Sequence, residues 1–248
     1  MNATAECRIL HRGAMRLELD PQAGLAQRLA QWDAEIEHIW ADEQRRNPTL
    51  YDAMLFCSTS FGVECGVAVV RGGFVRYSQH IAARKDPRIP LGGVPVGVSG
   101  LLLVARNGVE HTVLGTRQAS AATSAGRLEL VPSGGVDASC LGPGGAPDHQ
   151  AMLLAELEEE TGIAAAEALC VEDFLLAQDR ETGILDLCQL IRLAPEATRR
   201  LRLDGGGEYD GLHVLPLAQA LEMLEARPCV AVSRTMLQVL LHQAKEKT

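Results

Sequence analysis

The sequence lacks the features that mark several large classes of protein. Its apolar runs, such as residues 101–104, are far shorter than the roughly 20 residues of a membrane-spanning helix. The first residues contain no positively charged segment followed by an apolar one, so we expect no secretory signal. With 23 basic and 32 acidic residues the net charge is −9, which argues against a generic nucleic-acid or anionic-membrane surface.

Closely spaced cysteines are also missing. The seven cysteines are scattered without any C-x-x-C pair, and the seven histidines show no ligand spacing. This usage favours reduced thiols in a cytoplasmic protein over disulfides or a zinc site. With 47% apolar and 22% charged residues, the 248-residue chain has the composition of a globular protein of one large domain or two small ones.

Basic residues are absent from one long internal segment. Residues 128–179 contain 11 acidic residues and no lysine or arginine, whereas the rest of the chain has 23 basic and 21 acidic residues. Four glutamates crowd into residues 156–160, near the end of a predicted helix that Asp148 caps and Gly162 terminates. Helical periodicity places three of them on one face, namely Glu156, Glu159 and Glu160, and turns Glu158 away.

This acidic face is unfavourable for the helix by itself. Each like-charged i,i+4 pair costs about 0.2–0.5 kcal/mol, and the last turn of a helix normally prefers lysine or arginine. The ordinary interpretation of such a run is a solvated surface. The alternatives are a basic residue brought in from another segment, or a divalent cation held by the carboxylates.

The remaining patterns predict a mixed α/β protein. We expect a long amphipathic helix over residues 22–46, a hairpin of strands 63–70 and 74–80, and a second hairpin of strands 99–105 and 110–117. Further strands are predicted at 128–131, 174–178, 184–191 and 212–216, followed by a helix at 217–226 and a last helix capped by Ser233. The Gly- and Pro-rich residues 89–97 mark a boundary between an N-terminal region (1–92) and a second domain (93–248).

The segment around the acidic helix resembles the box motif of the Nudix hydrolases, G-x5-E-x7-R-E-U-x-E-E-x-G-U, where U is aliphatic. Residues 156–163 match every defined position. Ala155 replaces the arginine of the box, six residues are inserted between Gly135 and Ala155, and Pro147 stands where the first glutamate belongs.

The insertion, together with residues 39–56, 114–120 and 206–211, resembles one branch of that family, the UDP-glucose and UDP-galactose pyrophosphatases with an interrupted box. The resemblance implies a Nudix-type α/β/α sandwich with a mixed sheet, preceded by an N-terminal α+β extension. That extension would shape either the substrate pocket or a homodimer interface.

The resemblance also implies roles for particular residues. Glu156, Glu159 and Glu160 would be ligands of Mg²⁺ or Mn²⁺ and one of them would orient the attacking water. The other candidates are the backbone carbonyl of Gly134 or Gly135 as a further metal ligand, Glu208 as an additional acid or an exposed loop charge, Arg117 ahead of Arg106 and Arg84 for phosphate, and Tyr51 and Phe56 for stacking on a base or filling the core.

The implied function is Mg²⁺-dependent cleavage of a nucleoside diphosphate linked to a second group, with UDP-glucose converted to UMP and glucose 1-phosphate. The alternatives are a Nudix hydrolase of ADP-ribose or a dinucleotide, a catalytically weak nucleotide sensor, and a purely structural domain. For both hydrolases and for the sensor, the partner is a small nucleotide derivative and not a nucleic acid or a membrane.

Overall fold

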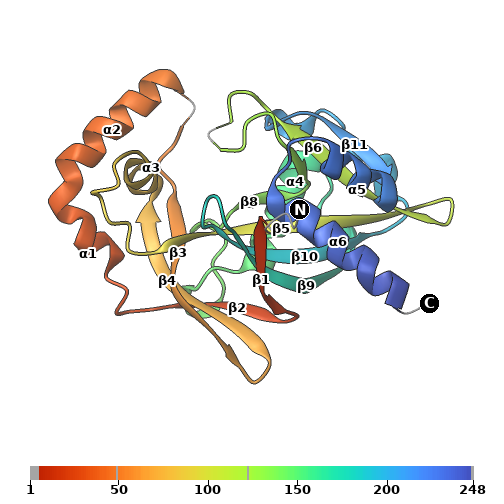
Figure 1. Cartoon of the computed structure of the whole chain (residues 1–248), viewed down its shortest axis with the longest axis horizontal. Coiled ribbons are helices and arrows are strands. Elements are labelled where there is room, and N and C mark those ends of the chain that lie inside the picture. Colours follow the sequence, from red (N-terminus) through yellow and green to blue (C-terminus); the bar gives the residue numbers. More distant parts are fainter. Residues whose placement is uncertain (1–5, 49, 122, 247–248) are drawn as a thin grey trace, which may run out of the picture.

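The computed structural model describes residues 6–48, 50–121 and 123–246, and in them helices lie on both faces of one mixed sheet (Figure 1). The main strand order is β1-β9-β10-β5-β3-β4-β2, and β6, β7, β8 and β11 join through β5 and β6. The strands are β1 (Cys7–Arg12), β2 (Met15–Leu19), β3 (Met54–Glu64), β4 (Val67–Arg76), β5 (Val94–Arg106), β6 (Val109–Arg117), β7 (Leu128–Leu130), β8 (Ser133–Gly135), β9 (Ala168–Asp179), β10 (Leu185–Leu193) and β11 (Tyr209–Pro216).

The central strand β5 separates two apolar cores. Successive side chains of a strand point to opposite faces. Accordingly, Val98 and Leu102 pack with α4 (His149–Thr161), whereas Leu101 and Leu103 pack with α5 (Leu217–Ala226) and α6 (Ala231–Glu246). Strand β10 runs parallel to β5 while β6 runs antiparallel to it. The predicted α/β class with a mixed sheet between helices is therefore confirmed.

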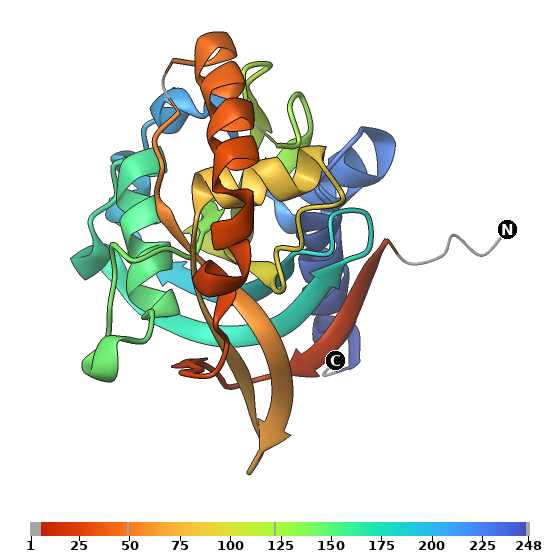
Figure 2. The same ribbon diagram turned by 90° about the vertical axis from the view of Figure 1, so that its left-hand side faces the viewer.

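The N-terminal helices form a third cluster. Helices α1 (Leu25–Leu29), α2 (Asp33–Arg46) and α3 (Tyr77–Lys85) surround a small core that includes Leu29, Ile36 and Val75. Figure 2 shows these helices together on one side of the molecule, with the β3–β4 hairpin projecting away from the rest. None of the helices in the described residues has the length and apolar character needed to cross a bilayer.

The N-terminal region is nevertheless joined to the rest of the sheet. Strand β1 pairs with β9, and β3 pairs with β5 through Cys57–Pro95 and Ser58–Val94. The proposed boundary at residue 92 thus falls beside strands that cross between the two regions, and it stays a prediction.

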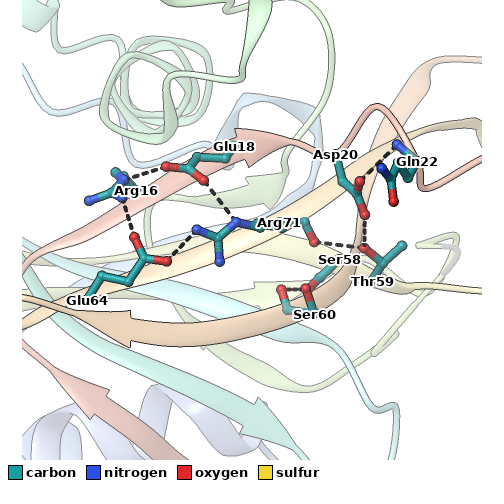
Figure 3. A network of polar contacts seen from close by, with 9 residues as sticks. All are labelled: Arg16, Glu18, Asp20, Gln22, Ser58, Thr59, Ser60, Glu64 and Arg71. Atoms are coloured by element: carbon teal, nitrogen blue, oxygen red, sulfur yellow. Dashed lines mark hydrogen bonds and ion pairs between the residues drawn. The ribbon is translucent and has the colours of Figure 1, made fainter.

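A ring of ion pairs holds β2 alongside β4 (Figure 3). Arg16 contacts Glu18 and Glu64, each at 2.8 Å, and Arg71 contacts the same two carboxylates at 3.0 and 2.5 Å. The four side chains are 35–45% exposed, so the ring fixes the position of an edge strand more than it stabilises the fold.

The first predicted hairpin has its turn in the wrong place, because β3 ends at Glu64 and β4 begins at Val67. The chain reverses at Cys65 and Gly66, whose φ angles of 49° and 81° suit a tight hairpin turn. Gly72 serves a different purpose, because a Cβ there would lie 2.0 Å from the carbonyl oxygen of Cys57. Its lack of a side chain allows β3 and β4 to approach closely. The predicted strand 74–80 is divided, because β4 ends at Arg76 and α3 begins at Tyr77.

Helix ends were predicted with mixed success. Asp148 caps α4 by accepting hydrogen bonds from the backbone N–H groups of Gln150 and Ala151 at 3.1 and 3.0 Å, and Gly162 ends the helix with a φ of 73°. Ser233 is not a cap, because α6 begins at Ala231. Its hydroxyl instead accepts a hydrogen bond from the backbone N–H of Leu130 at 2.9 Å.

Two further differences concern the N-terminal region. The predicted helix over 22–46 is interrupted by a 3₁₀ turn at Ala30–Trp32. Strands β1 and β2 were not predicted at all. The hairpin of β5 and β6, the antiparallel pair of β9 and β10, strand β11 and helix α5 confirm the remaining assignments.

Candidate metal and phosphate site

Helix α4 carries Glu160 into the interior of the protein. The side chain is fully buried. One carboxylate oxygen accepts a hydrogen bond from the backbone N–H of Ser133 at 3.2 Å, and the other accepts one from the hydroxyl of Tyr209 at 3.1 Å. Glu160 is therefore held between α4, β8 and β11 in a fixed orientation.

Glu156 lies one helical turn earlier, directly against β8. A Cβ at Gly134 would lie 2.0 Å from a carboxylate oxygen of Glu156. Glycine at this position therefore makes the space that the carboxylate occupies. Gly135, the next residue, has no such neighbour, since its nearest atom would be a methyl group of Leu55 at 3.5 Å.

The buried Glu160 and the partly buried Glu156 both have strongly raised pKa values. Burial raises the pKa of Glu156 to about 8, with further contributions from the charges of Glu208, Glu159 and Asp137. Burial likewise raises the pKa of Glu160 to about 9, assisted mainly by Glu156 and opposed by the hydrogen bond from Tyr209. Neither carboxylate forms an ion pair with a lysine or arginine in the described part of the chain.

Arg117 is the basic group of this region. It lies at the end of β6 with only 16% of its side chain exposed. Nη1 donates to Glu129 at 2.7 Å, and Nη2 lies 3.6 Å from Glu208. The guanidinium carbon is 5.7 Å from the centre of the Tyr209 ring. Its Nε is buried and has no hydrogen-bond partner within the described residues.

Two members of this network were missed by the sequence analysis. Glu129 is buried and accepts hydrogen bonds from both Arg117 and Tyr209. It stands between two leucines that face the α5–α6 core, so strand alternation directs it to the opposite face, and that alternation was the available signal. Tyr209 follows Glu208 in the segment 206–211, which the sequence analysis used only for the family resemblance and from which it named only Glu208.

These groups border a cavity of about 410 Å³ between the sheet and the N-terminal region. Its acidic side contains Glu156, Glu208, Glu129 and Asp137 together with Arg117. The N-terminal region contributes the opposite side, which includes Tyr51, Tyr77 and His80, and a third part is formed by Gly97, Ser99, Gly134, Gly135 and Asp186. The cavity therefore combines acidic, basic and aromatic groups from distant parts of the chain.

The structure separates the remaining candidates. Tyr51 is on the cavity wall but 72% exposed, and Phe56 is fully buried in the core against Phe74. Core packing, the second alternative for Phe56, is thus its role. Arg106 and Arg84 are exposed and line no part of this cavity, because β5 carries Arg106 out to the β5–β6 turn.

The exposed glutamates of α4 differ in their surroundings. Both Glu158 and Glu159 are exposed, but only Glu159 is close enough to influence the pKa of Glu156. Glu158 does not figure among the charges that act on the buried pair.

The donor set fits an oxygen-preferring divalent cation such as Mg²⁺. Glu160 is buried and Glu156 partly buried, neither has an ion-pair partner among the described residues, and Glu156 lies against Gly134. The ligands are not yet gathered, however. Among the described residues no three carboxylate, imidazole or thiol groups are close enough to hold a metal ion.

The chain matches no family model and no curated protein sequence. Among solved structures it is similar to a C. elegans Ap4A hydrolase binary complex, with 16% identity, a TM-score of 0.44, and coverage of 62% of this chain and 99% of that one. It is also similar to the Nudix domain of Shewanella oneidensis NrtR complexed with ADP ribose, with 18% identity, a TM-score of 0.44 and coverage of 68% and 96%. A mutT/nudix family protein from Listeria innocua gives 19% identity, a TM-score of 0.41 and coverage of 62% and 95%. Similarities this distant assign neither family nor activity, which must be inferred from the residues of the chain itself.

Proposed function

We propose that the protein is a divalent-metal-dependent hydrolase that cleaves the diphosphate of a nucleotide sugar, with UDP-glucose converted to UMP and glucose 1-phosphate. The observation that carries this proposal is the pair formed by the fully buried Glu160 and the partly buried Glu156, which lies near Arg117; neither forms an ion pair with a basic residue in the described part of the chain. A protein without a cation to bind gains nothing from two such carboxyl groups, since burial makes their charged forms costly and raises their pKa values.

The metal ligands we propose are Glu156, Glu159 and Glu160, with a backbone carbonyl of Gly134 or Gly135. Glu208 is a further candidate, because its charge acts on both buried glutamates. Bound Mg²⁺ or Mn²⁺ would supply positive charge to the phosphoryl oxygens and lower the pKa of a water molecule.

The other residues position the reacting groups. Ser133 and Tyr209 fix the orientation of Glu160 through its two oxygens. Glu129 accepts a hydrogen bond from Nη1 of Arg117. This contact fixes the orientation of the whole planar guanidinium group. A preoriented arginine loses little freedom when it binds a phosphate oxygen, and this supports its role as the phosphate-binding group.

The cavity also supports the substrate class. Its volume of about 410 Å³ lies within the range of small-molecule pockets, roughly 300–1,000 Å³. Tyr51 and Tyr77 on the N-terminal side offer aromatic surfaces for a nucleobase. The preference for UDP-glucose over ADP-ribose or a dinucleotide comes from the resemblance of the interrupted box.

A nucleotide sensor is the second candidate. Two observations favour it: Ala155 replaces the arginine of the box, and the acidic side chains are not gathered into a metal site. Such a protein would bind the nucleotide in the same cavity without turning it over.

The test combines binding with product analysis. The purified protein is mixed with UDP-glucose, ADP-ribose or a dinucleotide in Mg²⁺, and calorimetry is followed by chromatography of the products. UMP and glucose 1-phosphate support the hydrolase, and binding without products supports the sensor. No heat and no product with any of these compounds refute both. Glu158→Gln serves as the matched control for Glu160→Gln, because both lie on α4 and only Glu160 is buried.

A further inference from the structure

A second cavity, of about 490 Å³, lies between the β9–β10 turn and the start of α6. Its walls contain four arginines, which come from four separate segments of the chain. They are Arg127 before β7, Arg180 after β9, Arg227 after α5 and Arg234 in the first turn of α6. Such a concentration of guanidinium groups is unusual in a chain whose net charge is −9.

Two of these arginines are already neutralised. Arg127 donates to both carboxylate oxygens of Glu181 at 3.0 and 3.3 Å, and Arg234 pairs with Glu6. These contacts hold the β9–β10 turn and Glu6, the residue before β1, in place around the cavity.

The other two arginines have no such partner. Arg180 and Arg227 form no ion pair and donate no side-chain hydrogen bond within the part of the chain that the structure describes. The remaining carboxylate of the wall belongs to Asp179, which accepts from the backbone N–H groups of Glu181 and Thr182 at 2.8 and 2.9 Å. The cavity thus presents two free guanidinium groups, each a planar fork of N–H donors.

The chemistry of these donors selects the ligand. Guanidinium forks match the oxygens of a phosphate group, which can accept from both arginines at once. We propose that this cavity binds a phosphate group, either free or as a phosphate monoester, through Arg180 and Arg227. The site is separate from the acidic cavity, although Asp179 lies on the walls of both. It does not depend on the hydrolase activity proposed above.

The experiment measures the binding of inorganic phosphate to the whole chain by calorimetry, in buffer with a chelator and with ionic strength held constant by chloride. The chelator removes metal-dependent binding at the acidic cavity, and any phosphate that Arg117 binds there persists when Arg180 or Arg227 is replaced, so only the binding lost in those variants reports the arginine cavity. Glucose 1-phosphate is the second probe, and it distinguishes a site for free phosphate from one that takes a phosphate ester.

We expect saturable binding by the wild-type protein. Arg180→Gln and Arg227→Gln should each weaken it about tenfold, which corresponds to the loss of one charge-assisted hydrogen bond. Arg199→Gln is the matched control, because Arg199 is likewise exposed but lies outside this cavity. The proposal is overturned if neither probe binds saturably, or if the two arginine variants bind as tightly as Arg199→Gln.

Discussion

The replacement Glu160→Gln tests the charge of the buried site directly. At pH 7 the folded protein keeps this carboxyl group protonated, because its pKa is raised to about 9, while the unfolded chain has it ionised with the ordinary pKa of 4.5. Each pH unit above 4.5 then lowers the stability of the folded state by about 1.4 kcal/mol, so the upper limit at pH 7 is roughly 3 kcal/mol.

The sign of the effect follows from this difference. A raised pKa leaves full stability below pH 4.5, and stability is lost progressively as the pH rises towards 9. Glutamine carries no charge in either state. Its amide oxygen can accept from Ser133 and its NH₂ can donate to the hydroxyl oxygen of Tyr209, so both contacts survive. In metal-free buffer we therefore expect the variant to gain about 1–3 kcal/mol over wild type at pH 8 and nothing at pH 4.5.

The measurement is urea unfolding in EDTA at several pH values, with Glu158→Gln as the control. Glu158 is exposed on the same helix, so its replacement should change the unfolding free energy by less than about 0.5 kcal/mol. The hydrolase activity of Glu160→Gln should be lost despite its higher stability. A variant less stable than wild type at pH 8, or a stability difference independent of pH, would refute this account of the buried carboxyl group.

Three further replacements probe the neighbours of this group. Gly134→Ala should reduce kcat/KM at least about tenfold, because the new Cβ displaces the carboxylate of Glu156. Gly135→Ala is the control, since its Cβ meets nothing closer than 3.5 Å and the variant should remain active. Equal kcat/KM values for the two variants would contradict this. Arg117→Lys keeps the charge but loses the planar donor fork, so we expect kcat/KM to fall about tenfold, and an unchanged value would remove this residue from phosphate binding. Tyr209→Phe removes a buried hydroxyl that contacts two carboxylates, and urea unfolding should show a loss of about 1–3 kcal/mol.

The sequence predicted those parts of the fold that depend on local chemistry. Asp148 and Gly162 mark the ends of α4 because an N-cap side chain and a left-handed C-cap act within a few residues. The same holds for the β5–β6 hairpin, whose turn contains Asn107 and Gly108 with positive φ. The hairpin predicted from strands 63–70 and 74–80 placed Gly72 between its strands, because the purpose of this glycine, close approach to Cys57, exists only in the folded sheet.

The candidate site was predictable only in part, for the same physical reason. Glu156, Glu159 and Glu160 are neighbours on one helix, so periodicity alone groups them. Glu129 and Tyr209 reach Glu160 and Arg117 only when β6, β7 and β11 pair, and no local pattern contains that information. On the aromatic side of the cavity only Tyr51 was a candidate, because Tyr77 and His80 begin a helix where the sequence predicted a strand.

The pairing of Cys7 with Asp179 has a consequence for the order of events during synthesis. The ribosome releases β1 long before β9 exists, so this edge of the sheet stays open until most of the protein has been translated. Contacts between such distant segments slow folding, and an unpaired edge can recruit another chain in the meantime. Strand β1 therefore has no partner strand until translation reaches β9.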